Sequence, residues 1–276
     1  MILVTGATGH VGNVLVRELL AQEQQVRAMT LPNDNCASLE GLDVERVTGN
    51  VLDSASLDRA MDNVDVVYHL AGIISILPGA EALMRKVNVD GVRNTAQAAL
   101  RAGVRRMVHI SSIHAFRRMP HGVCIDEHVP FAPDSPVGTY DRTKAEGTLA
   151  VLETVEQGLD AVIACPTGVI GPYDYLDSEM GNVIRNFAQK RLHFLVEGAY
   201  DFVDVRDVAR GLTLAAEKGR AGETYILSGA RIEIAQIKQV VQEFAGIRTP
   251  HIVAPMWVAE LVARIAEPFY RLTHAI

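Results

Sequence analysis

A glycine-rich turn at the start of the chain constrains the fold more than any other feature. Residues 5–12 read TGATGHVG, and they lie between a short apolar run and an amphipathic pattern typical of a helix over residues 10–22. Gly6 permits a tight turn, Gly9 lets backbone N–H groups approach a pyrophosphate, and Gly12 lets the helix pack close to the strand. A triple-glycine pattern alone also occurs in ordinary turns. In this strand–turn–helix context it predicts a dinucleotide at the helix N-terminus.

Short runs typical of buried strands alternate with longer helical patterns along most of the chain. This alternation predicts an α/β protein, a Rossmann-type doubly wound parallel sheet with helices on both faces and ligands at the C-terminal strand ends. The expected strands cover residues 2–4, 25–29, 44–47, 64–69, 106–110, 160–164 and 224–227. The expected helices cover residues 10–22, 54–62, 80–102, 139–157, 179–190, 205–218 and 234–246.

The alternation becomes irregular after about residue 166, where prolines and glycines interrupt it. We expect residues 1–165 to form the dinucleotide-binding core and residues 166–276 to form a mixed region. Most of that region is predicted to be a smaller, substrate-facing C-terminal lobe, and about residues 203–228 are predicted to return to the core. The apolar stretch of residues 255–268 predicts a helix docked on the protein or on a neighbouring subunit, because its polar face is not rich in Lys and Arg.

Composition and charge narrow the classes of partner. A net charge of −7 and a pI near 5.7 offer no basic face for nucleic acid. No segment has the run of about 18 apolar residues that spans a membrane, so we expect neither nucleic acid nor membrane as a partner. The three cysteines include no Cys-x-x-Cys pair, which fits a reducing compartment and predicts no metal site. The first residues form no signal-peptide pattern, and a cytoplasmic location is the default expectation.

Three polar residues far from the glycine turn could move a proton. Tyr140 and Lys144 are four positions apart in a predicted helix, so their side chains project from one face about one turn apart. A nearby ammonium favours the phenolate, which would make Tyr140 a proton donor or acceptor near neutral pH. Ser112 follows the expected strand of residues 106–110 and would hydrogen-bond the reacting substrate oxygen. Together the three predict hydride transfer at an alcohol or carbonyl.

These motifs make the sequence similar to the extended short-chain dehydrogenase/reductases, also called the NAD-dependent epimerase/dehydratase family. The resemblance covers most of the chain. It rests further on residues 69–72 (HLAG), 88–91 (NVDG), 166–172 (PTGVIGP) and 202–208 (FVDVRDV). Residues 126–131 (DEHVPF), just ahead of Tyr140, resemble the branch that contains dihydroflavonol reductases, related aldehyde or ketone reductases and sugar epimerases.

The resemblance implies NAD or NADP as cofactor. It implies that the backbone of residues 71–72 lies beside the cofactor, that the segment after residue 166 borders the nicotinamide, and that Lys144 also binds the nicotinamide ribose. The residues expected at the cofactor are Gly6, Thr8, Gly9, His10, Val11, Gly12, Thr30, Asn50, Val51, Leu70, Ala71, Gly72, Tyr140, Lys144, Pro166 and Val169.

Two positions depart from the family pattern. After the second strand, NAD-preferring relatives place an acidic residue and NADP-preferring ones often an arginine, whereas this chain has Met29, Thr30 and Leu31. No carboxylate at these positions repels the 2′-phosphate of NADP, and no arginine binds it. The sequence therefore favours NADP only slightly. Asn50 stands where the family usually has Asp, and its amide oxygen can still accept a hydrogen bond from an adenine amino group.

Three further residues are candidates to contact the substrate: His114, Tyr173 and Tyr175. His114 lies two positions after Ser112, where dehydratases of the family carry an acid, so sugar-nucleotide dehydration is disfavoured. A lone histidine near a strand end is also commonly a packing residue, and the two tyrosines could equally anchor their loop.

The sequence thus predicts an NAD(P)-dependent oxidoreductase that transfers a hydride between nicotinamide and a small-molecule carbonyl or alcohol, with Tyr140 as general acid/base. Two alternatives stay open. One is a nucleotide-sugar epimerase that uses the same Ser–Tyr–Lys triad, and the other is a non-catalytic dinucleotide-binding regulator. The resemblance implies a homodimer through the predicted helices at 80–102 and 139–157, and many relatives continue past residue 272.

Overall fold

The computed structural model describes residues 1–74, 79–120, 122–191, 194–247 and 252–255. The chain divides into two units, of which the first joins Met1–Leu176 to Val203–Ser228 and the second joins Asp177–Phe202 to Gly229–Ile276. The glycine turn and the predicted Ser–Tyr–Lys triad all belong to the first unit.

The first unit extends past the boundary expected at residue 165. Residues 166–176 stay with the core because their loop hydrogen-bonds to the first helix, where Asn13 Nδ2 donates to Tyr173 O at 3.0 Å. Residues 203–228 also belong to this unit and supply one helix and one edge strand of its sheet.

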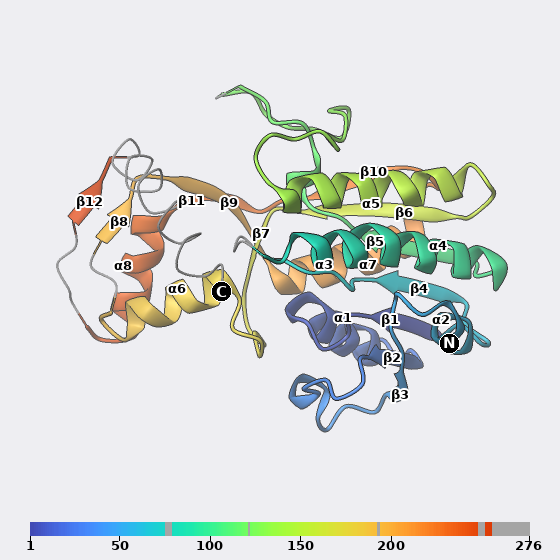
Figure 1. Ribbon diagram of the computed structural model, residues 1–276. Coiled ribbons are helices and arrows are strands. Elements are labelled where there is room, and N and C mark those ends of the chain that lie inside the picture. Colours follow the sequence, from blue (N-terminus) through green and yellow to red (C-terminus); the bar gives the residue numbers. More distant parts are fainter. Residues whose placement is uncertain (75–78, 121, 192–193, 248–251, 256–276) are drawn as a thin grey trace. The chain divides into compact units, whose positions relative to one another are not determined.

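A seven-stranded parallel sheet organises the first unit (Figure 1). Its strand order is β10-β6-β5-β4-β1-β2-β3, so the order reverses between β1 and β4, where a doubly wound sheet opens a crevice for ligands. The predicted Rossmann-type fold is confirmed. The strands are β1 (Ile2–Thr5), β2 (Val26–Thr30), β3 (Glu45–Thr48), β4 (Val66–His69), β5 (Arg106–Ile110), β6 (Ala161–Pro166) and β10 (Thr224–Leu227).

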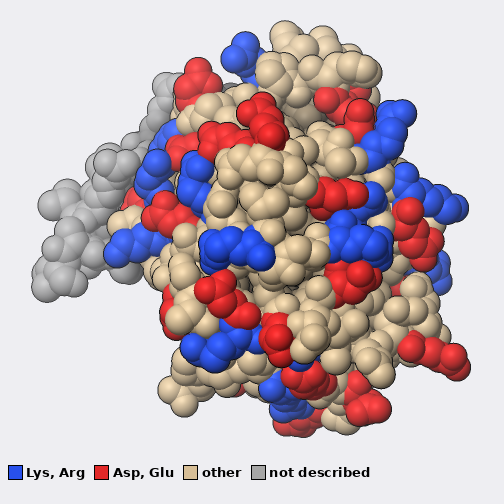
Figure 2. Space-filling view, turned by 90° about the vertical axis from the view of Figure 1, so that its right-hand side faces the viewer, with Lys and Arg blue, Asp and Glu red and all other residues tan. Residues whose placement is uncertain are grey.

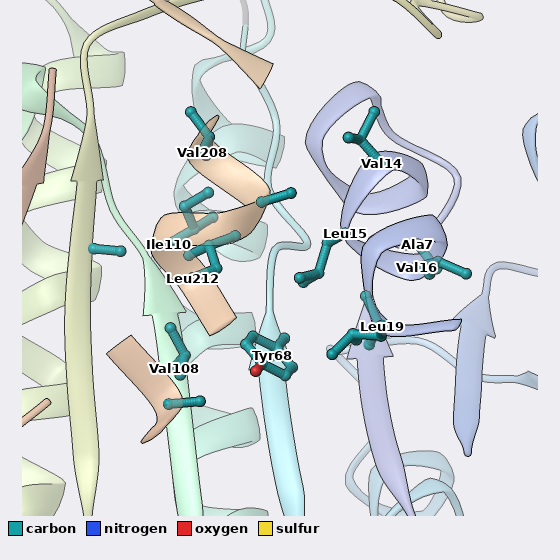
Figure 3. Packing of buried hydrophobic residues seen from close by; sticks show 14 of the residues in the cluster. Ala7, Val14, Leu15, Val16, Leu19, Tyr68, Val108, Ile110, Val208 and Leu212 are labelled. Atoms are coloured by element: carbon teal, nitrogen blue, oxygen red, sulfur yellow. The ribbon is translucent and has the colours of Figure 1, made fainter. Parts of the chain in front are cut away.

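Helices cover both faces of this sheet, because successive strand residues point to opposite faces and both sets are apolar. On one face lie α1 (His10–Ala21) and α7 (Val205–Lys218), and on the other lie α2 (Ser54–Ala60), α4 (Val92–Arg101) and α5 (Thr139–Val155). Figure 3 shows the first face, where Leu15 and Leu19 of α1 and Leu212 of α7 pack beside Tyr68 and Val108 of the sheet.

The single helix predicted over residues 80–102 is three elements in the structure. A short α3 (Glu81–Arg85) leads into a π-helical turn, η2 (Lys86–Gly91), and α4 follows. A π-helical turn is an i→i+5 insertion that sequence periodicity does not show, and such turns are frequent at functional sites. This one places Asn88 against α5, where a Cβ on Gly147 would lie 2.1 Å from Asn88 O.

Several short elements had no signal in the sequence, because three or four residues are too few to show a period. In the first unit these are η1 (Ala37–Leu39), η3 (Ile113–Ala115) and β7 (Gly168–Ile170). The second unit contains the helices α6 (Glu179–Ala188) and α8 (Ile234–Phe244). Its strands β8 (Phe194–Val196) and β12 (Ile252–Ala254) pair in parallel. Strands β9 (Ala199–Asp204) and β11 (Ala230–Glu233) pair antiparallel, and the last residues of β9 belong to the first unit.

The helix expected at residues 255–268 lies outside the described residues, apart from the exposed Pro255. Within the described ranges, no helix combines the length and the apolar character needed to cross a membrane. On the face shown in Figure 2, Lys and Arg side chains are interspersed with Asp and Glu, and no continuous basic surface is visible there.

We expect Leu212→Ala to lower the free energy of unfolding by about 2–5 kcal/mol, because it leaves a cavity in the core beneath α7. Leu212 is fully buried, whereas Leu214 on the same helix is 49% exposed. Leu214→Ala is therefore the matched control, with a change of about 0.5 kcal/mol or less. Urea denaturation of both variants measures the difference, and equal losses would contradict this packing.

Candidate functional site

The glycine turn between β1 and α1 leaves no room for a side chain at Gly6 or Gly12. Gly6 has a φ of 68°, and a Cβ there would lie 2.7 Å from Ala71 N. A Cβ on Gly12 would lie 2.1 Å from Gly6 O, and α1 begins after Gly9 without a side-chain cap. The turn therefore presents the uncapped N–H groups of a twelve-residue helix, which fits the diphosphate of a dinucleotide.

The strand register brings the segment after β4 to this turn. Thr5, His69 and His109 are register partners on β1, β4 and β5, so the three strands end at one edge. Thr5 Oγ1 lies 2.8 Å from His69 Nδ1 and accepts a hydrogen bond from Ala71 N at 3.3 Å. The predicted cofactor residues 70–72 thus lie beside the glycine turn.

Asn88 fixes the chain just beyond these residues. Its Oδ1 accepts from Ile73 N at 2.8 Å, and its Nδ2 donates to Ile73 O at 2.9 Å and to Thr143 Oγ1 at 3.2 Å. Asn88 therefore links the segment after β4 to α5, which carries Tyr140 and Lys144. Asn88 belongs to the family motif of residues 88–91, but the sequence predicts no function for it, because the π-helical turn that presents it has no sequence signal.

The loop after β2 also reaches the glycine turn. Thr8 Oγ1 donates to Asp34 Oδ2 at 2.9 Å, and Ser38 Oγ donates to Thr8 O at 3.0 Å. The family pattern for cofactor choice concerns residues 29–31. Asp34 lies further along this loop, so the pattern did not predict it as a site residue. Leu31 itself is 51% exposed.

The segment that follows β7 lies across α1. His10 Nε2 lies 2.9 Å from Pro172 O, and the guanidinium of Arg17 lies 4.4 Å from the centre of the Tyr173 ring. Tyr173 is thus held against the glycine-turn helix, and Tyr175 N donates to Tyr173 O at 3.1 Å. These contacts agree with a loop-anchoring role for Tyr173, and the contact of either tyrosine with substrate stays a prediction.

The remaining predicted cofactor residues lie at the ends of β2, β3 and β6. Thr30 O accepts from Gly49 N at 2.9 Å, and Asn94 Nδ2 donates to Val51 O at 3.1 Å. Asn50 Oδ1 already accepts from Leu52 N at 2.9 Å, so an adenine amino group would have to share that oxygen. Pro166 ends β6, and Val169 packs in β7 against the core on the α1 face.

Ser112, Tyr140 and Lys144 come together at the end of β5. Ser112 lies close enough to the Tyr140 phenol to lower its pKa, and Lys144 Nζ donates to Ile110 O at 2.8 Å. The neighbouring Ser111 is used differently, because its Oγ lies 2.6 Å from Thr148 Oγ1 inside the core. Of the two serines, Ser112 is the one beside the phenol.

Burial sets the proton affinities of this group. It raises the pKa of Tyr140 to about 12, with the Ser112 hydrogen bond acting in the opposite direction, and it lowers the pKa of Lys144 to about 8. From the sequence, Lys144 is expected to lower the pKa of Tyr140. In the chain alone, burial of Tyr140 outweighs any such effect, and the Lys144 ammonium is directed to Ile110 O.

His114 lies next to the phenol. Its ring meets the Tyr140 ring edge-on, with centroids 5.9 Å apart. Its Nδ1 lies 3.1 Å from Arg118 Nη2 and 3.5 Å from Asp141 Oδ1, and Arg118 also pairs with Asp141 at 3.2 Å. The structure therefore places His114 where it could contact a substrate at Tyr140, and that contact stays a prediction.

The comparison with protein families decides what kind of protein this is. The model of the NAD dependent epimerase/dehydratase family matches residues 2–228. The chain belongs to this family. The predicted resemblance is confirmed, and family members include NAD-dependent reductases, dehydratases and epimerases, so the protein is an enzyme of the extended short-chain dehydrogenase/reductase type.

Individual relatives match almost the whole chain. Sterol demethylase protein B of Methylococcus capsulatus is 40% identical over 98% of this chain and 82% of its own. A putative dihydroflavonol 4-reductase of Synechocystis is 31% identical over 96% of this chain and 78% of its own. The crystal structure of gox2253 superposes with a TM-score of 0.90 at 32% identity, covering 98% of this chain and 82% of that one. The predicted homodimer stays a prediction.

We expect the contribution of Lys144 to the free energy of unfolding to rise by about 2 kcal/mol between pH 8 and pH 10, against an opposite contribution from buried Tyr140 and Cys165, whose pKa values are raised. The pKa of Lys144 is about 8 in the folded chain against 10.5 in an exposed lysine, so its side chain binds more protons in the unfolded state over this range, and its contribution to stability increases with pH. Lys144→Met should remove this increase, whereas the exposed Lys218→Met should retain it. Urea denaturation at several pH values measures the slopes, and parallel curves for all three proteins would contradict the burial argument.

Proposed function

We propose that this family member is an NAD(P)-dependent oxidoreductase that transfers a hydride between nicotinamide and a carbonyl or alcohol carbon. The observation that carries the proposal is the position of the Tyr140 phenol beside Ser112 and His114 at the end of β5. Buried Lys144 lies one turn further along α5. The glycine turn lies at the same edge of the sheet, so a dinucleotide and the phenol would act on one substrate.

Each residue of the triad has a definable task. A tyrosine with a pKa near 12 keeps its proton at neutral pH, which is the form that can donate to a carbonyl oxygen. Ser112 would orient that oxygen by hydrogen bonding. Lys144, positively charged below its pKa of about 8, would stabilise the phenolate that remains after the proton has left. A reduced nicotinamide, when bound, supplies the hydride, so the carbonyl gains one hydride and one proton.

The proposed substrate is a small-molecule ketone, aldehyde or alcohol. The relative named as a dihydroflavonol 4-reductase supports a reductase reaction, and its similarity extends over 96% of this chain. Ile113 and His114 replace the acidic pair that the family's dehydratases use, which disfavours dehydration. His114 and Tyr175 are the proposed substrate contacts. Tyr173 is proposed to act mainly as an anchor, because it stacks on Arg17.

We expect Tyr140→Phe to lower carbonyl-dependent oxidation of NADH or NADPH at least about 100-fold, because phenylalanine has no proton to give. Dinucleotide binding, followed by isothermal titration, should be largely retained. Tyr225→Phe is the control, because the Tyr225 hydroxyl accepts a structural hydrogen bond from Arg220 N. Its activity should stay close to that of the parent protein.

The same assays discriminate the alternatives. Binding of a UDP-sugar with no net oxidation of cofactor would indicate an epimerase. Dinucleotide binding without turnover on any carbonyl or sugar would indicate a regulator, and undiminished activity in Tyr140→Phe would overturn the assigned role of Tyr140.

A further inference from the structure

A carboxylate is directed at the glycine turn from the loop after β2. Asp34 Oδ2 accepts a hydrogen bond from Thr8 Oγ1 at 2.9 Å. Thr8 lies between Gly6 and Gly9 and is almost fully buried, with 7% of its surface exposed. Asp34 therefore lies at the C-terminal ends of β1 and β2. It is not one of residues 29–31, where the family pattern places the residue that distinguishes NAD from NADP.

The loop holds Asp34 in this place through backbone and side-chain contacts. Asn33 has a φ of 62°, and Asp34 N donates to Leu31 O at 3.2 Å, so the chain turns back directly after β2. Further along, Ser38 Oγ donates to Thr8 O at 3.0 Å, and Arg17 Nη2 donates to Ser38 O at 3.0 Å. The loop is thus attached to both the glycine turn and α1.

No cation neutralises this carboxylate in the part of the chain that the structure describes, since Asp34 takes part in none of its ion pairs. The nearby guanidinium groups have other partners. Arg17 contacts Ser38 O and the Tyr173 ring, and Arg46 donates to Leu39 O at 3.0 Å. The Asp34 carboxylate therefore faces the glycine turn without an ion-pair partner among the described residues, and the exposed Leu31 adds no positive charge.

We infer that Asp34 makes this site select NAD over NADP. A carboxylate beside the glycine turn, on its β2 side, can accept hydrogen bonds from the ribose hydroxyls of NAD, whereas it repels the 2′-phosphate of NADP. The preference is opposite to the slight one that residues 29–31 suggested, because the acid reaches the site from further along the loop. The inference rests on the dinucleotide site of the proposed function and adds the discrimination between its two cofactors.

Isothermal titration with NAD and with NADP, at one pH and ionic strength, tests the inference without any substrate. The parent protein should bind NAD at least about tenfold more tightly than NADP, because like charges in close proximity are costly. Asp34→Asn keeps an oxygen for Thr8 and removes the charge, so it should reduce this ratio about tenfold, mainly through tighter NADP binding. Thermal melting of both proteins, each with and without dinucleotide, gives a second readout and checks that the variant folds.

Two further variants sharpen the test. Asp43→Asn removes the same charge from an exposed position just before β3, at the opposite edge of the sheet, and should leave the ratio unchanged. Leu31→Arg combined with Asp34→Asn should bind NADP more tightly still, because an arginine can clamp a phosphate.

The possible failures are distinguishable. Equal affinities for NAD and NADP in the parent protein, or an unchanged ratio in Asp34→Asn, would overturn the inference and leave the proposed dinucleotide site intact. Equal weakening of both dinucleotides in Asp34→Asn would show a purely structural carboxylate and would also overturn it. Absence of binding by either dinucleotide would overturn both the inference and the proposed function.

Discussion

The close approach of the β1–α1 turn to the segment after β4 is the constraint on which the rest of the site depends. Gly6 lies so near Ala71 and Gly12 so near Gly6 O that any side chain at either glycine would force the backbone apart. Because these contacts are backbone to backbone, they bring the N-terminus of α1 to the ends of β1 and β4. The predicted cofactor residues, the loop that carries Asp34 and the π-helical turn that carries Asn88 are arranged around that point.

A second close contact positions α5, the helix that carries Tyr140 and Lys144. Gly147 lets α5 approach the π-helical turn at Asn88, and this contact seats Lys144 in the core beneath the ends of the central strands. The same burial controls the chemistry. It raises the pKa of Tyr140, lowers that of Lys144, and keeps His69 neutral with a pKa of about 3. Packing therefore produces a phenol that keeps its proton and, on the same helix, an ammonium that loses its proton more readily than that of an exposed lysine.

Local patterns were sufficient for much of this architecture. The glycine turn, the seven strands of the main sheet and the triad residues each follow from short sequence signals, and the structure assembles the triad at one strand end. The parts that were missed depend on contacts between distant segments. Asp34 bonds to Thr8, Asn88 bonds to Ile73, and the loop after β7 bonds to α1, which moves the unit boundary to Leu176.

The sequence by itself determined the seven strands of the main sheet and the larger helices between them, the position of the glycine turn and the candidates for proton exchange, because these depend on side-chain period and residue chemistry along a few turns of chain. Only the tertiary structure decided which serine faces Tyr140, how the pKa values of Tyr140 and Lys144 shift, and which carboxylate approaches the glycine turn. Those properties depend on desolvation and on hydrogen bonds between segments far apart in sequence, and no local pattern encodes the distance between them.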